Sequence, residues 1–85
     1  MRTGPQTPTE RWLARAWATV LGVGVDEIGR QDSFFDRGGT SLQAVKLAVT
    51  VDRAVSLTDL TRHPVLADLA ALVDARRAAE LVPPS

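Results

Sequence analysis

The sequence predicts an all-α protein: a small four-helix bundle with three longer helices, one short third helix, and a long loop between the first and second helices. Two observations carry this prediction. Apolar residues recur at helical spacing in three separate segments. Hydroxyl residues and prolines stand where helices would begin. Because the chain has 85 residues and 45% of them are hydrophobic, we expect one folded domain with a modest core.

The first helix is expected to begin just after Thr7. Thr7 can cap the helix, Pro8 suits its first position, and Glu10 completes a capping box. Adjacent apolar residues, repeated every four positions, then form one helical stripe: Trp12/Leu13, Ala16/Trp17 and Val20/Leu21. We expect both tryptophans to pack in the core or at its edge, and Gly22 to end the helix.

Residues 23–40 are expected to form a long connection. Loops of this length in a small domain are usually functional or packed by their own side chains. Val25 and Ile28 are spaced to reach the core, with a single helical turn near them. We expect at least one of Phe34 and Phe35 to be buried and to hold the loop in place.

The second helix is expected to run from Ser41 to Val51. Its polar residues share one stripe: Gln43, Lys46 and Thr50. The other residues after Ser41 are apolar, a wider arc than a helix resting on one neighbour needs. Either the helix is wedged deeply into the bundle or part of the arc meets a partner. Leu42 and Leu47 flank the polar stripe, and the pattern alone leaves open which of them is exposed.

Two further helices are expected after a short turn. Ser56 caps a short third helix that ends near Thr61. The last helix is expected to start at His63-Pro64, with the proline in its first turn. Arg76 and Arg77 suit the C-terminal end of its dipole.

The predicted organisation has three parts. Residues 1–6 form an N-terminal arm, residues 7–79 the folded domain, and residues 80–85 a C-terminal tail. We expect a discrete small protein, and a domain cut from a longer chain is the alternative.

Composition excludes several classes of function. Ten basic and ten acidic residues cancel, and neither sign forms a long block. The charge balance therefore gives no support to nucleic-acid binding or to a polybasic membrane anchor, and no apolar run is long enough to span a bilayer. With no cysteine and one histidine, we expect no disulfide and no metal site. The expected state is a cytoplasmic monomer.

The stretch from Asp32 to Leu42 is the part of the sequence that indicates a function. Two aromatic residues lead into Gly38 and Gly39, and Ser41 follows where the second helix begins. The glycines are expected to allow uncommon backbone angles and to keep the approach to Ser41 open. We interpret Ser41 as an exposed serine that another protein modifies. The alternative is that Ser41 simply caps its helix.

A self-contained hydrolase fits the sequence poorly. Ser41 lacks the second glycine of a nucleophile elbow. The single imidazole, His63, belongs to another segment, and no carboxylate is marked to orient it. The run from Gly38 to Ser41 also lacks the lysine of a phosphate-binding P-loop. We therefore expect the chain not to be an enzyme.

Residues 32–42, which read DSFFDRGGTSL, resemble the core motif of peptidyl carrier (thiolation) domains of nonribosomal peptide synthetases, D-x-F-F-x-x-G-G-x-S-L. Every fixed position of that motif is present. The tryptophan-bearing first helix resembles the family's opening, and residues 57–70 resemble its third and fourth helices. The paired glycines and neutral net charge resemble peptidyl carriers more than the acidic acyl carriers of fatty-acid synthesis.

The resemblance implies that Ser41 carries a covalent 4'-phosphopantetheine arm, which a phosphopantetheinyl transferase installs from coenzyme A. The thiol of the arm would hold an amino acid, aryl acid or growing peptide as a thioester and take it between partner enzymes. Gly38, Gly39 and Thr40 would form the site loop. The attached phosphodiester would suit the N-terminus of the second helix, where free amides and the dipole favour an anion.

The resemblance also implies contacts with partner enzymes. Leu42 and Val45 match positions that often contact partners in the family, which favours Leu42 over Leu47 as the exposed flank. Core packing is the alternative for both. Arg37 and Lys46 would add charge contacts. The implied partners are the transferase, an adenylation enzyme or domain, and condensation or tailoring enzymes.

Two other functions stay open. One is an acyl carrier protein of a polyketide or hybrid pathway, which would accept malonyl or other acyl groups. The other, from a different class, is a small helical interaction module without a prosthetic group.

One segment departs from the family's pattern. The connection from the second to the third helix, residues 51–56, is shorter than usual by roughly one helical turn, about 4–6 residues at 3.6 per turn. We expect the second helix to end early or the turn into the third helix to be abrupt. Under one hypothesis, this short connection marks a carrier that serves a narrow set of enzymes.

Overall fold

Four α-helices and one 3-10 turn make up the computed structural model, which describes residues 4–81. The elements in chain order are α1 (Pro8–Leu21), η1 (Val25–Glu27), α2 (Ser41–Thr50), α3 (Leu57–Arg62) and α4 (Leu66–Leu81). The predicted all-α fold, with a short third helix and a long first loop, is confirmed. α4 continues to Leu81, into the segment predicted as a tail, and the rest of that segment lies outside the described residues. None of these helices combines the length and apolar character needed to cross a membrane.

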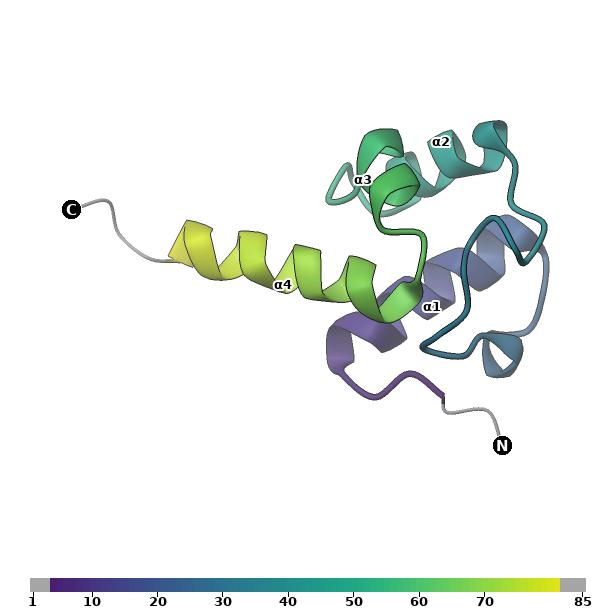
Figure 1. Cartoon of the computed structure of the whole chain (residues 1–85), viewed down its shortest axis with the longest axis horizontal. Helices are drawn as coiled ribbons and strands as arrows, with labels where there is room; N and C mark the ends of the chain where they lie inside the picture. The colour runs from purple at the N-terminus through teal and green to yellow at the C-terminus, as the bar shows by residue number, and fades with distance from the viewer. Residues whose placement is uncertain (1–3, 82–85) are drawn as a thin grey trace.

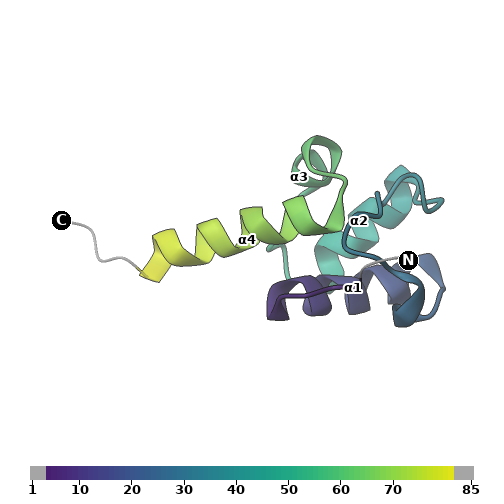
Figure 2. The same cartoon turned by 60° about the horizontal axis from the view of Figure 1, so that its bottom comes forward.

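α1 lies at the centre of the arrangement. It packs against both α2 and α4, and the short α3 packs against α2 (Figure 1). The view in Figure 2 shows α2 and α4 on the same side of α1, with α3 beyond them. The last turns of α4 project away from the other helices in both views.

The core lies where α1, α2 and α4 meet the long loop. Its largest fully buried side chains come from every helix and from the loop: Trp17, Phe34, Leu13, Ile28, Leu47, Leu60, Leu66, Leu69 and Val55. Trp17 is fully buried, whereas Trp12 is half-buried with the guanidinium of Arg77 over its ring, 5.1 Å from the centroid. The predicted roles of the two tryptophans, core and core edge, are therefore confirmed. Val25 was expected to reach the core but is 45% exposed, because η1 turns its side chain outward, and only Ile28 is buried.

The start of α1 is fixed by a cap and by an ion pair. Thr7 Oγ1 accepts the Glu10 N–H at 3.0 Å, as predicted. The Glu10 carboxylate does not complete the capping box. It accepts the N–H of Gln6 at 3.0 Å and receives two hydrogen bonds from Arg30, at 3.0 and 3.1 Å. These bonds from Arg30 are the main cause of a lowered pKa for Glu10. The carboxylate thus ties the long loop to α1. At the other end, Gly22 adopts φ 72° and ends the helix as predicted.

Backbone hydrogen bonds join the loop to the start of α4. The Phe34 N–H donates to the Pro64 carbonyl at 2.8 Å, and the first two amides of α4 donate to the loop: Leu66 to Asp32 at 3.0 Å and Ala67 to Arg30 at 2.9 Å. The prediction that Pro64 lies in the first turn of this helix is wrong, because its segment is extended against the loop and the helix begins at Leu66. Two of the four amides that a helix start leaves free are thereby satisfied by loop carbonyls.

Phe34 packs inside the loop that leads to α2. Its ring meets the Trp17 ring edge-to-face, with centroids 5.4 Å apart. A Cβ on Gly39 would lie 2.3 Å from the Phe34 ring and 2.8 Å from the Phe34 carbonyl oxygen. Gly38 has φ +90°, a conformation that other residues rarely adopt. We expected both glycines to keep the approach to Ser41 open. At Gly39 this is wrong, since the missing side chain makes room for Phe34.

The connection from α2 to α3 is as abrupt as its short length predicts. α2 ends at Thr50, one residue before the expected end, and Val51 forms its C-cap. Asp52 and Arg53 then both adopt positive φ, 52° and 62°. Two consecutive residues of this kind reverse the chain within a few positions, at a cost in backbone strain. Ser56 then caps α3, as predicted.

A side-chain cluster fastens α3 to α4. Arg76 of α4 donates to both carboxylate oxygens of Asp59, one bond measuring 2.7 Å, and the Ser56 N–H donates to the same carboxylate at 2.9 Å. The hydrogen bonds from Arg76 lower the pKa of Asp59 far below its usual value, and the Ser56 amide adds to this effect against the opposing influence of burial. The Asp59 carboxylate therefore stays charged in the folded protein at mildly acidic pH.

The packing of Phe34 predicts the effect of filling the space at Gly39. We expect Gly39→Ala to lower the free energy of unfolding by about 1–3 kcal/mol, because the new methyl overlaps the Phe34 ring and carbonyl. Urea unfolding measures this change. Gly4→Ala is the matched control, since a Cβ on Gly4 would meet nothing within 4 Å. Equal stability of the two variants would contradict the proposed packing.

The cluster around Asp59 predicts how stability depends on pH. A carboxylate with a lowered folded pKa contributes stability that is fully present above its unfolded pKa, about 4, and is lost as the pH falls toward the folded value. We expect the free energy of unfolding of the wild type to decline from pH 5 to about pH 2, and Asp59→Asn to remove part of that slope. Urea titrations at several pH values test this. Asp26→Asn, on exposed η1, should keep the wild-type slope. The account is wrong if both variants behave alike.

Candidate functional site

Ser41 is the first residue of α2 and is exposed. The helix is capped by its neighbour instead: Thr40 Oγ1 accepts the Gln43 N–H at 3.2 Å, and Gln43 Oε1 accepts the Thr40 N–H at 3.0 Å. The alternative that Ser41 only caps its helix is therefore wrong. The Ser41 hydroxyl takes part in none of the hydrogen bonds among residues 4–81.

The start of α2 suits an anionic group on Ser41. The capping box uses the amides of Thr40 and Gln43, and in the described part of the chain no hydrogen bond uses those of Ser41 and Leu42. Free amides and the positive end of the helix dipole stabilise negative charge at this place. The side-chain amide of Gln43 also donates to the Val20 carbonyl at 3.4 Å, which links the start of α2 to α1.

Hydrogen bonds between its own residues hold the loop that precedes Ser41. A turn forms in which Arg37 N–H donates to the Ser33 carbonyl at 3.0 Å and Gly39 N–H donates to the Phe34 carbonyl at 3.1 Å. The Arg37 side chain lies beside Asp32, with 3.9 Å between Nε and Oδ2. Its charge is thus partly engaged within the loop. Gly38 and Thr40, the other predicted site-loop residues, are exposed beside Ser41.

The predicted contact residues on α2 are at the surface. Leu42 is 66% exposed and Val45 is 47% exposed, whereas Leu47 is fully buried. The preference for Leu42 over Leu47 as the exposed flank is confirmed. Lys46 is also exposed.

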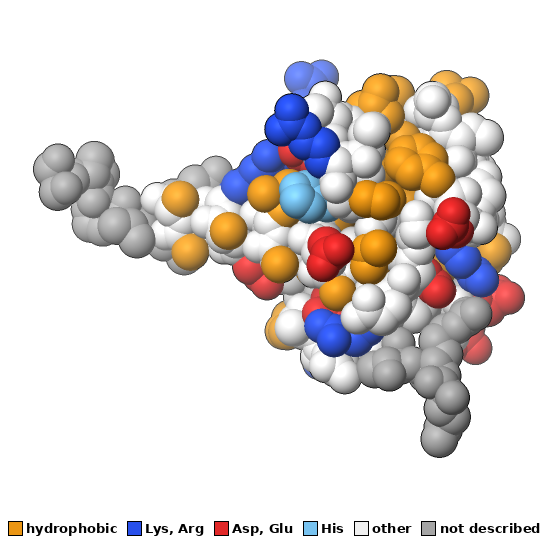
Figure 3. Space-filling model, in the orientation of Figure 1, with side chains coloured by type: hydrophobic (Ala, Val, Ile, Leu, Met, Phe, Trp, Pro, Cys, Tyr) orange, Lys and Arg blue, Asp and Glu red, His pale blue; other side chains and the backbone are white. Residues whose placement is uncertain are grey.

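Sequence reasoning missed two exposed apolar residues of this surface. Val49 on α2 is 69% exposed, and Leu57 at the start of α3 is 41% exposed. Val49 follows Leu42 by seven positions and Val45 by four, a spacing that places all three on one helix face. That spacing could have identified Val49, whereas Leu57 depends on how α3 folds back. Figure 3 shows hydrophobic side chains near the site loop and α2, with basic side chains over α3.

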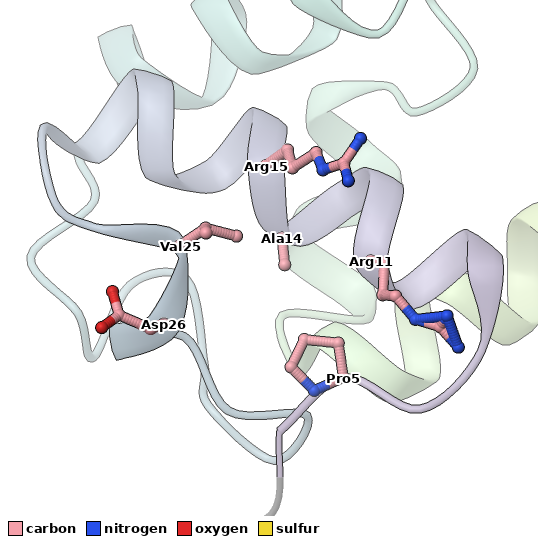
Figure 4. Close-up of a pocket in the computed structure, with 6 residues that line it drawn as sticks. All are labelled: Pro5, Arg11, Ala14, Arg15, Val25 and Asp26. Atoms are coloured by element: carbon pink, nitrogen blue, oxygen red, sulfur yellow. The ribbon is translucent and has the colours of Figure 1, made fainter.

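Away from Ser41, the described part of the chain has no cluster of side chains that indicates a metal or charged site. No group of three or more His, Asp or Glu side chains that could hold a metal ion occurs among residues 4–81. A hollow of about 280 Å³ lies between the N-terminal arm, α1 and η1 (Figure 4). The guanidinium groups of Arg11 and Arg15 point away from Asp26 there, so no charged groups converge in it.

Comparison with protein families gives a match over most of the chain. The family model described as "Phosphopantetheine attachment site" matches residues 11–73, which include Ser41 and the whole site loop. The family carries a covalently attached 4'-phosphopantetheine.

Curated proteins that are similar to this chain include nonribosomal peptide synthetases. The chain is 44% identical over 78 residues to the nonribosomal peptide synthetase easA of Emericella nidulans; the match covers 87% of this chain and 1% of the synthetase. The synthetase kk1B of Curvularia clavata is 47% identical over 76 residues, which cover 85% of this chain and 1% of that protein. The chain thus spans about one hundredth of the length of these curated relatives.

A solved structure described as a non-ribosomal PCP domain has a TM-score of 0.73 and 36% identity, and the match covers 81% of this chain and 91% of that one. Its fold is the four-helix arrangement described above. The chain therefore belongs to the phosphopantetheine attachment family, in which it is a peptidyl carrier domain of nonribosomal peptide synthesis.

Proposed function

We propose that Ser41 is the residue on which this carrier holds its 4'-phosphopantetheine arm. One observation carries the assignment: Ser41 is exposed at the first position of α2, and its hydroxyl is free because Thr40 does the capping. The thiol of the bound arm would hold an aminoacyl or peptidyl group as a thioester. The amides of Ser41 and Leu42 would stabilise the phosphodiester.

The chain's own residues support attachment without catalysing it. No histidine belongs to the site, because His63 is at the C-terminal end of α3. We propose that a separate phosphopantetheinyl transferase supplies the base for the Ser41 hydroxyl. The role of Gly38, Gly39 and Thr40 is to hold Ser41 forward while the loop behind it stays packed on Phe34.

Loading and unloading would also occur through partners. We propose an adenylation enzyme or domain, and condensation or tailoring enzymes, as those partners. Leu42 and Val45 would meet them with apolar contacts and Lys46 with charge. Arg37 would contribute less, since its side chain faces Asp32. We propose that the domain, residues 7–79, acts as a monomer in the cytoplasm.

Modification of the purified protein tests the assignment. Incubation with coenzyme A, magnesium and a promiscuous transferase should raise the intact mass by one phosphopantetheine, because the Ser41 hydroxyl is accessible. Ser41→Ala should abolish the gain, whereas Ser33→Ala, which removes the other serine of the loop, should retain it.

Two results would contradict the assignment. One is a mass gain in Ser41→Ala, which would place the arm on another residue. The other is a wild-type protein that is folded by circular dichroism and stays unmodified while a known carrier is modified in the same mixture.

A further inference from the structure

Three helices begin with the same arrangement, and the start of α2 differs from the other two in one residue. In α1, α2 and α3, a hydroxyl side chain caps the helix and accepts the N–H of the residue three positions later: Thr7 with Glu10, Thr40 with Gln43, and Ser56 with Asp59. That later residue is an acid in α1 and α3 but a neutral amide in α2. The comparison therefore singles out Gln43.

The other helices carry negative charge at their starts. Glu10 of α1 receives two hydrogen bonds from Arg30, and Asp59 of α3 receives two from Arg76. α4 has Asp68 in its first turn. An acid in the first turn stabilises a helix, because it lies near the positive end of the dipole. Of the four helices in the described chain, only α2 lacks such an acid.

The sequence around α2 is also free of acids. Between Asp36 and Asp52 the chain has two charged residues, Arg37 and Lys46, and both are basic. No carboxylate of this segment would therefore repel a negative charge attached to Ser41.

The side-chain amide of Gln43 makes two hydrogen bonds at the start of α2. Its oxygen accepts the Thr40 N–H at 3.0 Å, and its nitrogen donates to the Val20 carbonyl at 3.4 Å. Together with the Thr40 hydroxyl, it occupies the amides of residues 40 and 43. The amides of Ser41 and Leu42, which lie between them, donate no hydrogen bond among residues 4–81.

Capping alone does not explain why residue 43 is neutral. A glutamate at this position could accept the Thr40 N–H just as well, and it would also suit the helix dipole. However, a glutamate would place a carboxylate two residues from the attachment serine. There it would compete with the phosphodiester for the free amides and repel it.

We propose that Gln43 is the positioning residue of the attachment site, a neutral cap that leaves the Ser41 and Leu42 amides and the dipole of α2 to the phosphodiester of the arm. This inference rests on the proposed function, because it requires the arm to be on Ser41. The phosphodiester then supplies to α2 the negative charge that the acids in the first turns supply to the other three helices.

The variant Gln43→Glu tests the charge, since it keeps an acceptor for the Thr40 N–H. The unmodified and modified proteins are melted at low salt, in a reducing agent that keeps the thiol of the arm free. Modification should shift the melting temperature about 2–5 °C less favourably in Gln43→Glu than in the wild type. High salt should diminish this difference. Gln6→Glu, which adds the same charge at an exposed position before α1, should behave as the wild type.

The variant Gln43→Met tests the hydrogen bonds without adding charge. In the wild type, attachment of the arm should shift the amide NMR signals of Ser41 and Leu42 and leave that of Thr40 in place. In Gln43→Met the Thr40 amide loses its acceptor, so its signal should shift with the other two on attachment. A purely structural role would lower the stability of both forms equally and would not change which amides respond.

Two outcomes would overturn the inference. One is an equal effect of modification on the melting temperatures of Gln43→Glu and the wild type. The other is a Thr40 signal that does not respond to attachment in Gln43→Met. If the transferase does not accept Gln43→Glu, Ser41→Asp supplies the negative charge instead. Gln43→Glu should then be less favourable with Ser41→Asp than without it, and equal effects would overturn the inference.

Intact mass of the same samples separates these failures from a failure of the carrier assignment. If the assignment is wrong, the wild-type protein gains no phosphopantetheine on Ser41. If only the inference about Gln43 is wrong, the wild type gains the arm, and the substitutions at residue 43 have the same effect with and without it.

Discussion

The structure depends on the packing of Phe34 between α1 and the loop that presents Ser41. The ring meets Trp17 edge-to-face at 5.4 Å on one side, and on the other it occupies the space that a side chain at residue 39 would need. The Phe34 amide also bonds to the start of α4 through Pro64. One buried aromatic residue thus couples the core, the site loop and the last helix. Because the loop is fixed from within, its outer side can present a hydroxyl with no internal bonds.

At the start of α2, the residues that cap the helix are not the residue that carries the free hydroxyl. Thr40 and Gln43 form the capping box between them, so the Ser41 hydroxyl makes no capping hydrogen bond. A side chain that makes no hydrogen bond within the fold can be modified without breaking one. The same logic applies to the outer face of α2, where Leu42, Val45 and Val49 remain exposed while Ala44 and Leu47 are buried. One side of the helix packs in the core, and the other side is exposed.

Much of the fold could be predicted because it depends on local rules. Thr7, Gly22 and Ser56 act at helix ends as their residue types indicate, and apolar periodicity predicts the three longer helices. The predicted start of α4, His63-Pro64, is two to three residues early, since the extended pairing of this segment with the loop is a long-range contact that no local signal reveals. The role of Gly39 differs from the prediction because the group that approaches it, the Phe34 ring, lies within the same loop. A glycine beside a functional residue indicates close approach, but only the structure tells whether the approaching group comes from inside or outside.

The exposed position of Ser41 at the start of α2 could be predicted from the sequence, but the surroundings of Ser41 could not. The motif predicts an exposed serine where α2 begins, whereas the exposure of Leu57 depends on the turn at Asp52 and Arg53. Amide NMR of the protein before and after modification tests the central claim most directly. The account predicts that the Ser41 and Leu42 amide signals shift strongly when the arm is attached, while those of Phe34 and Gly39 stay in place. Unchanged signals at the head of α2, or a rearranged loop, would contradict it.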